Sequence, residues 1–357
     1  MKNRLKNGIA IALIPQIIMV KVLGAYPEFI ETYYSEGLYP RISKFFRWMF
    51  GWVPFSVGDL LYFSLIFFAV RYLIVKRKHI RKNLKSFFRD VIMVLSTAYF
   101  TFHLLWGFNY YRQPIVEKLG LPESHTKKEL VTLIEELTVQ TNALQLTITK
   151  DSTQRVEIPY TKQEIFEKTI TGYQKLEKSL PFLSYNSPSI KTSLFSTGLT
   201  YMGYGGYLNP FTNEGQVNGR LPNFRFPVVA GHEIGHQVGY SAENDTNFIG
   251  YLVTASNDDL YFQYSASAYA LGYCLSELKR RDEAIFEKFY TQLHPGVQGN
   301  FREMAEFWQQ FENPLEPIFK SIFDSFLKAN SQVEGIKSYN AVVALLVNYH
   351  KENPLKN

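Results

Sequence analysis

Three apolar stretches near the N-terminus constrain this 357-residue chain more than any other feature. They cover approximately residues 9–25, 53–75 and 91–108. A helix needs about 20 mostly apolar residues to cross a bilayer, so the second and third stretches are predicted to be transmembrane helices. The first stretch is shorter and has two interpretations. It is either a third span, or residues 1–25 are a cleaved signal peptide with a basic start and small residues at its end.

Basic residues indicate the orientation of these spans. Of 38 Lys and Arg residues, 15 lie within residues 1–89, against 4 of the 32 Asp and Glu residues. Seven of the 15 fill the link between the second and third stretches. Positively charged links stay in the cytoplasm, so this link and the N-terminus are predicted to be cytoplasmic, with residues 109–357 outside. The protein is therefore expected to be a multi-pass protein of the cytoplasmic (inner) membrane.

The same charge distribution bears on partners. A basic link between two spans faces anionic lipid, so the lipid bilayer is the expected partner and nucleic acid is not. The second stretch contains Asp59 and Arg71, which would lie about 18 Å apart along a helix. We therefore expect these two charged residues near opposite interfaces of the membrane. The sequence leaves the oligomeric state open.

The rest of the chain has the pattern of one domain. Thr126 with Glu129, and Thr161 with Glu164, match the capping box that starts a helix. A segment rich in Gly, Tyr and Asn at residues 189–218 favours short strands and turns. Helical patterning then returns and continues almost to the C-terminus.

These patterns predict a membrane-anchored α+β fold. Residues 1–108 would form a transmembrane anchor of about three helices. Residues 109–357 would form an extracytoplasmic, mainly α-helical domain around a small sheet.

The sequence His-Glu-Ile-Gly-His at residues 232–236 indicates metal chemistry. On a helix, His232 and His236 share one face and can bind one zinc ion, while Glu233 projects toward a water molecule beside it. Pro227 suits the first turn of this helix, and a glycine suits its end. The single cysteine, Cys274, excludes disulfides within the chain and metal sites built from several cysteines.

A catalytic zinc usually has three protein ligands. Glu243 lies at the start of the next predicted helix, where a tight turn would bring it back to the histidines. Asp245 is the competing third ligand, on a different side of that helix. Asn247 follows Glu243 by four residues and suits a hydrogen bond to a ligand histidine.

The segment Glu-x-x-Thr-Asn at residues 243–247 resembles the Glu-x-x-Ala-Asp/Asn motif of several H-E-x-x-H peptidase families. The larger block is similar to an uncharacterised family of bacterial membrane-anchored H-E-x-x-H proteins. The matching pieces are Trp106–Arg112, Gly205–Glu214, His232–Gly239, Glu243–Leu252 and Ser338–Tyr339. This resemblance implies a zincin-like domain with a gluzincin-like zinc site and Glu243 as the third ligand. Thr246 stands where such motifs usually have Ala.

The expected function is that of a zinc metallopeptidase acting on a peptide or protein substrate. Glu233 would serve as general base toward the attacking water and then protonate the leaving amine. The alternative is a zinc-binding membrane scaffold or sensor without catalytic activity. Glu233 is dispensable for holding a metal, so its presence favours the enzyme.

Two further features of the site stay open at this level. Residues 205–211, with Gly205, Gly206 and Tyr207 as candidates, form either an edge strand that pairs with an extended substrate or a plain hairpin. Oxyanion stabilisation needs a further donor. The chemically suitable residues are Tyr339, Tyr251 and His294, and the sequence assigns the role to none of them.

Overall fold

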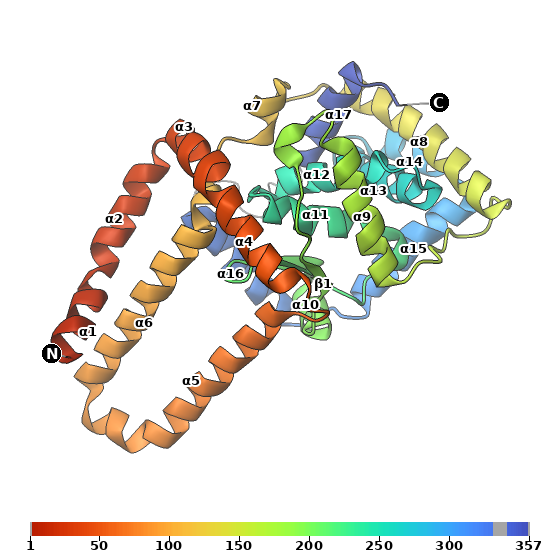
Figure 1. Ribbon diagram of the computed structural model, residues 1–357. Helices are drawn as coiled ribbons and strands as arrows, with labels where there is room; N and C mark the ends of the chain where they lie inside the picture. The colour runs from red at the N-terminus through yellow and green to blue at the C-terminus, as the bar shows by residue number, and fades with distance from the viewer. Residues whose placement is uncertain (1, 331–340, 356–357) are drawn as a thin grey trace.

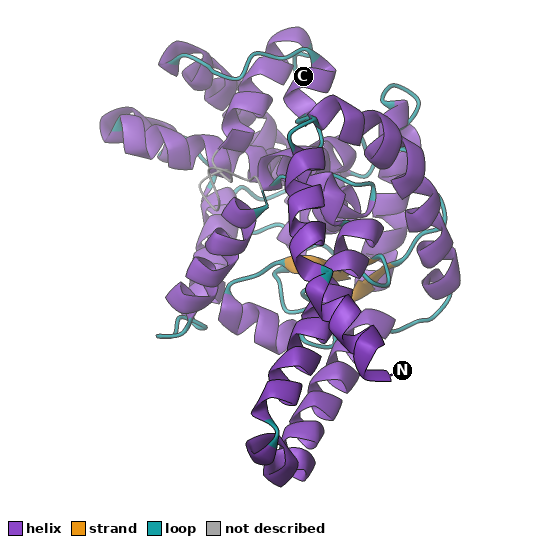
Figure 2. Ribbon diagram, turned by 90° about the vertical axis from the view of Figure 1, so that its left-hand side faces the viewer, coloured by secondary structure: helices purple, strands orange, loops and turns teal. Residues whose placement is uncertain are grey.

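The computed structural model describes residues 2–330 and 341–355. Long helices project from one end of a packed helical domain, and one small sheet lies among the helices of that domain (Figures 1 and 2). The expected α+β composition, mainly helical with a small sheet, is confirmed.

Within the described residues, three helical segments are long and apolar enough to cross a membrane. They are residues 3–24, which comprise α1 (Lys2–Ile11) and α2 (Leu13–Gly24), then α5 (Val57–Lys82) and α6 (Leu84–Leu105). At most 11% of the apolar window of each segment is buried inside the protein. Apolar surface of this extent is compatible with lipid rather than water, so the expected association with a membrane is supported.

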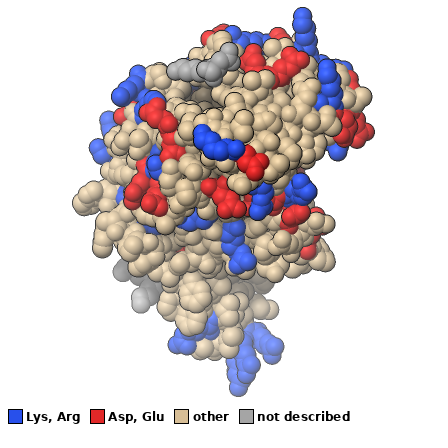
Figure 3. All heavy atoms as spheres, turned by 90° about the vertical axis from the view of Figure 1, so that its right-hand side faces the viewer, with Lys and Arg blue, Asp and Glu red and all other residues tan. Residues whose placement is uncertain are grey.

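The basic link between α5 and α6 is almost entirely helical. Helix α5 continues through Lys82, and only Asn83 interrupts the helix before α6 begins. Lys and Arg are good helix formers, and no Gly or Pro interrupts the run. Figure 3 shows the basic side chains at this tip, separated from the mixed charges of the domain by a largely uncharged band.

The two charged residues of the second span have different surroundings. Asp59 lies in the first turn of α5 and is fully buried. Its Oδ2 atom accepts hydrogen bonds from the backbone N–H of Leu194 at 2.6 Å and from Ser193 Oγ at 3.0 Å. Arg71 lies near the middle of α5 and is exposed. Asp59 therefore lies at the end of α5 that joins this helix to the domain, and Arg71 lies farther along the helix.

Residues 27–51 connect the first two spans and pack on the helical domain. They form α3 (Pro27–Phe29), the π-helix η1 (Ile30–Leu38) and α4 (Tyr39–Gly51). The short helix η2 (Gly107–Tyr111) follows α6 and packs against η1. Residues of the expected anchor thus form contacts with the interior of the domain.

The domain is built mainly from helices around a single large hydrophobic core. Both predicted capping boxes are confirmed, at the starts of α8 and α9. Its helices are α7 (Ile115–Leu119), α8 (Lys127–Thr149), α9 (Lys162–Leu176), η3 (Pro181–Leu183), α10 (Ser196–Met202), η4 (Asn223–Arg225), α11 (Phe226–Gln237), α12 (Glu243–Ala255), α13 (Leu260–Arg281), α14 (Glu283–Tyr290), α15 (Pro295–Gln309), α16 (Glu316–Ala329) and α17 (Val342–Glu352).

The sheet has the order β1–β3–β2, with β1 (Ile190–Thr192) parallel and β2 (Gly206–Asn209) antiparallel to the central β3 (Glu214–Val217). Strand β2 is therefore an edge of this sheet. Helix α11 packs against all three strands. The sheet thus lies directly over the helix that contains the His-Glu-Ile-Gly-His sequence.

Helices α11 and α12 are in backbone contact because a glycine from each faces the other. A Cβ atom added to Gly231 would lie 3.1 Å from the Cα of Gly250. One added to Gly250 would lie 2.6 Å from the carbonyl oxygen of Val228. Side chains at these positions would hold the helices apart. The two glycines therefore allow the start of α12 to lie against the metal-motif helix.

Candidate metal centre

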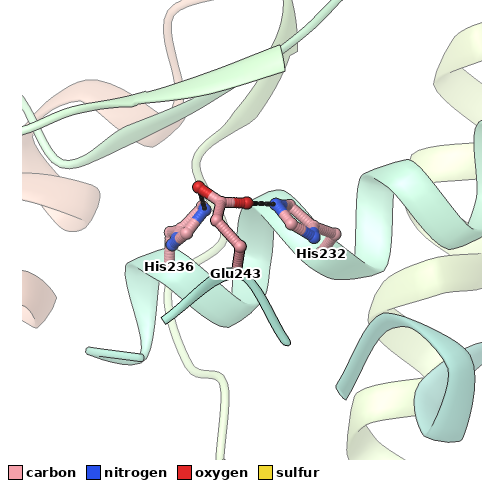
Figure 4. A group of neighbouring side chains, drawn as sticks. All are labelled: His232, His236 and Glu243. Atoms are coloured by element: carbon pink, nitrogen blue, oxygen red, sulfur yellow. Dashed lines mark ion pairs between the residues drawn. The ribbon is translucent and has the colours of Figure 1, made fainter. Parts of the chain in front are cut away.

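His232 and His236 point to the same side of α11, as expected for residues four positions apart. Glu243 is the first residue of α12. Its Oε2 lies 3.4 Å from His232 Nε2, and its Oε1 lies 3.9 Å from His236 Nε2 (Figure 4). One potential ligand atom from each of the three residues lies within 4.8 Å of the others. The predicted ligands are thus brought together from two helices.

The second nitrogen of each histidine ring has a partner. His232 Nδ1 lies 3.0 Å from Asn247 Oδ1, and His236 Nδ1 lies 2.8 Å from the carbonyl oxygen of Tyr240. Both partners are acceptors, so each Nδ1 donates a hydrogen bond, and each Nε2 is the nitrogen that faces Glu243. This is the arrangement that orients histidines as metal ligands. Two imidazole nitrogens and one carboxylate are a donor set that fits zinc.

Asp245, the competing ligand, points away from the histidines. Its Oδ2 accepts a hydrogen bond from the backbone N–H of Ile115 at 3.0 Å. Burial raises the pKa of Asp245 to about 7. The turn after α11 thus presents Glu243 to the histidines and directs Asp245 into the contact with α7.

Glu233 is almost completely buried, with 3% of the residue exposed. Among the described residues, its Oε2 atom has no hydrogen-bond partner. Burial raises the pKa of Glu233 to about 8, and the charge of Glu243 adds to this increase against the opposing effect of His232. A cation among the three ligands would favour the carboxylate form again, because an opposite charge nearby lowers the pKa.

The pKa values of the two histidines are shifted in opposite directions. Burial and the charge of His232 lower the pKa of His236 to about 4. Burial also acts to lower the pKa of His232, but its hydrogen bond to the Glu243 carboxylate and the charges of Glu233 and Glu243 outweigh this effect and raise the pKa. His236 is therefore held neutral, as a metal ligand must be.

Strand β2 passes directly over Glu233. A Cβ atom on Gly206 would lie only 2.4 Å from Glu233 Oε1, so no larger residue fits at this position without a shift. The carbonyl of Gly205 accepts a hydrogen bond from Asn218 N–H at 2.8 Å. Because antiparallel pairs alternate, the peptide groups of Gly206 and Leu208 then point away from β3, toward the free edge of the sheet. The hydroxyl of Tyr207 donates to Asp59.

Tyr39, Trp106 and Arg112 donate hydrogen bonds to backbone carbonyls at and just beyond the C-terminal end of α11. None of the three was predicted from the sequence to be a site residue. The Trp106 indole N–H donates to the carbonyl of His236 at 3.1 Å. The Tyr39 hydroxyl donates to the carbonyl of Gln237 at 2.8 Å, and Arg112 Nη1 to that of Gly239 at 3.0 Å. These last carbonyls of a helix lack partners within the helix. The sequence signal for Trp106 and Arg112 was their place in the resembling block; Tyr39 carried none.

Arg112 is itself fixed from the segment between the first two spans. Its guanidinium pairs with Glu31, with Nη2 2.6 Å from Oε1, and lies over the Tyr240 ring at 4.0 Å. The hydrogen bonds and charges of Arg112 and Lys118 outweigh the effect of burial and lower the pKa of Glu31. A buried ion pair thus links η1 to the turn that follows α11.

Two of the residues considered for oxyanion stabilisation, Tyr251 and His294, form hydrogen bonds with residues outside the metal cluster. The Tyr251 hydroxyl lies 2.6 Å from His350 Nε2, and His294 Nδ1 lies 2.8 Å from Gln145 Oε1. Tyr339 lies outside the described residues. Two phenols that the sequence did not indicate, Tyr110 and Tyr204, are close enough to Glu243 for its charge to raise their pKa values in addition to the effect of burial.

Fold and site together define a mainly helical protein with three helices fit to span a membrane and a buried His-His-Glu cluster. The chain belongs to the family described as "Protein of unknown function (DUF3810)", whose profile matches residues 34–347. No curated protein and no solved structure matches the chain.

Proposed function

We propose that this protein is a membrane-anchored zinc metallopeptidase whose site lies outside the cytoplasm. His232, His236 and Glu243 would hold the zinc ion, and the bound ion would supply Lewis-acid polarisation of a carbonyl and of water. The expected zincin-like character of the domain is part of this proposal. Its support comes from the geometry of the cluster and from the charge pattern around the spans.

The position of Glu233 is the observation that carries the proposal. Its carboxylate is not needed to hold a metal, yet it is buried with one oxygen unpartnered. Leaving a buried carboxylate oxygen without a partner is costly, so a structural role would be a poor explanation. A general base must keep such an oxygen free to take the proton of an attacking water. Glu233 would then deliver that proton to the leaving amine.

Strand β2 suits the binding of an extended substrate. The outward peptide groups of Gly206 and Leu208 are available for β-strand addition, which uses backbone hydrogen bonds and tolerates varied side chains. Gly206 lets this strand approach Glu233 closely. A substrate paired with β2 would thus present its peptide bonds beside the general base.

Metal content and hydrolysis together test the proposal. Purified full-length protein should contain about one zinc per chain by elemental analysis. The zinc should be lost in His232→Ala and retained in Glu233→Gln. Hydrolysis of a fluorogenic peptide library should fall by roughly 10²–10⁴-fold in Glu233→Gln, the usual contribution of a general base.

The outcomes separate the candidate classes. Undiminished hydrolysis in Glu233→Gln would remove this residue from the mechanism. Zinc bound at one per chain, with no cleavage of the library by wild-type protein, would favour a zinc-binding scaffold or sensor. Absence of zinc from folded full-length protein would contradict both.

A further inference from the structure

Helix α16 has an exposed apolar side that its neighbours do not explain. We call Leu315, Ile318, Ile322 and Phe326 the α16 stripe; their exposed fractions are 57%, 54%, 63% and 40%. Spacings of three, four and four residues place them along one side of the helix. A contiguous apolar surface of this kind marks a contact with lipid or with another protein.

The opposite flank of α16 is charged. Glu316 pairs with Lys320, and Asp324 with Lys328, each pair one turn apart. Between the two flanks, Phe319, Phe323 and Leu327 face the protein, and Leu327 is buried. The helix is therefore amphipathic in three parts: an inner apolar side, a charged flank and an outer apolar stripe.

The stripe continues onto a predicted membrane span. Phe326 contacts Phe102 of α6, with ring centroids 6.2 Å apart, and Tyr110 of η2 at 5.7 Å. Lys21 of α2 donates to the carbonyl of Ala329 at 2.8 Å. The C-terminal end of α16 therefore lies against the first and third spans where these enter the domain, beside α6 in Figure 1.

The inner side of α16 faces the candidate metal centre. The Tyr204 hydroxyl donates to the carbonyl of Phe319 at 3.3 Å, and the Tyr204 ring lies 5.5 Å from that of Phe323. Tyr204 leads into β2, and Tyr110 contacts Trp106 beside His236. Helix α16 thus touches both flanks of the site, Tyr204 through its inner side and Tyr110 through Phe326 of the stripe.

We propose that α16 is an interfacial helix whose stripe lies in the lipid surface on the side of the helical domain. Interfacial helices combine an apolar face with a charged one and bury the apolar face about 5–10 Å into the headgroup boundary. The contact with α2 and α6 fixes the depth of α16 at the end of the spans. Lipid is then the partner that covers the stripe, and the candidate site lies directly above the membrane.

Spin labels on full-length protein in phospholipid vesicles test this proposal. Ile318→Cys and Ile322→Cys place a label on the stripe, and Lys320→Cys and Ser321→Cys are matched exposed controls on the same helix. The native Cys274 is buried, so unsubstituted protein provides the blank. The ratio of collisions with oxygen to collisions with a water-soluble nickel chelate should be at least about threefold higher at the stripe than at the controls.

The remaining outcomes overturn the proposal. Equal ratios at positions 318, 320, 321 and 322 would place the stripe in water. Protection of the stripe labels from both reagents would show that protein covers it, a second copy of this chain included. These readouts need neither zinc nor hydrolysis, so they can fail while the proposed peptidase function stands, and the converse also holds.

Discussion

At the residue scale, the site depends on which acidic side chain the turn after α11 delivers. Residues 243 and 245 are both acidic and both buried, so composition does not distinguish them. The two side chains differ in direction at the start of α12. Glu243 reaches the histidines, whereas Asp245 accepts a hydrogen bond from the backbone N–H of Ile115 in α7. The sequence predicted that the two residues lie on different sides of the helix, so that only one could reach the histidines. The structure shows that the turn after α11 brings Glu243 to them.

Glu243→Ala is expected to lower zinc affinity on the order of 10-fold or more, because it removes one of three donors. Competition with a chromophoric chelator measures this affinity. Asp245→Asn is the matched control, since the amide oxygen still accepts the hydrogen bond of Ile115 and the zinc affinity should stay within about twofold of wild type. The ligand assignment is wrong if the two variants behave the other way round.

At the element scale, local signals identified the helices that carry their own start and stop residues. The capping boxes at Thr126 and Thr161, and Pro227 in the first turn of α11, are examples. The extension of the α5 helix through Lys82 was not predicted, because hydropathy identifies only the apolar part of a span. The turn that returns Glu243 to the histidines was expected, but the glycine contact between α11 and α12 was not, because a contact between two distant glycines leaves no local pattern.

Gly250→Ala is expected to destabilise the protein by about 1–3 kcal/mol, because the added Cβ would overlap the carbonyl of Val228. Zinc affinity should fall as well, since α12 carries both Glu243 and Asn247. The control is Gly272→Ala, also within a helix, where the nearest atom would be 3.6 Å away. Chemical denaturation and chelator competition measure both quantities. Equal stability of the two variants would show that the helices can separate at no cost.

At the scale of the whole molecule, the membrane spans and the site form one structure. The sequence indicated the spans from hydropathy alone, since each span is a local property. It placed the anchor and the domain on opposite sides of residue 108, because contacts between residues almost 200 positions apart cannot be read from a pattern. The hydrogen bond from Tyr39 to the carbonyl of Gln237 is such a contact.

Reporter fusions test the orientation of this structure. A fusion after Lys82 should show cytoplasmic reporter activity, because the link around it is strongly basic. A fusion after Arg112 should show extracytoplasmic activity, since α6 then leads outward. Alkaline phosphatase and a fluorescent protein that matures only in the cytoplasm provide opposite readouts for each site. Cytoplasmic activity at the second position would place the domain inside the cell.

The bonds from Tyr39, Trp106 and Arg112 to the end of α11 have a consequence for release of the domain from the membrane. Release of the domain after a proteolytic cut between Arg112 and α8 would remove these three side chains from the peptide carbonyls to which they donate. The shed fragment would carry every residue of the His-His-Glu cluster but not the groups that fix its helix. We therefore expect shedding to weaken the proposed site instead of creating a diffusible form of it.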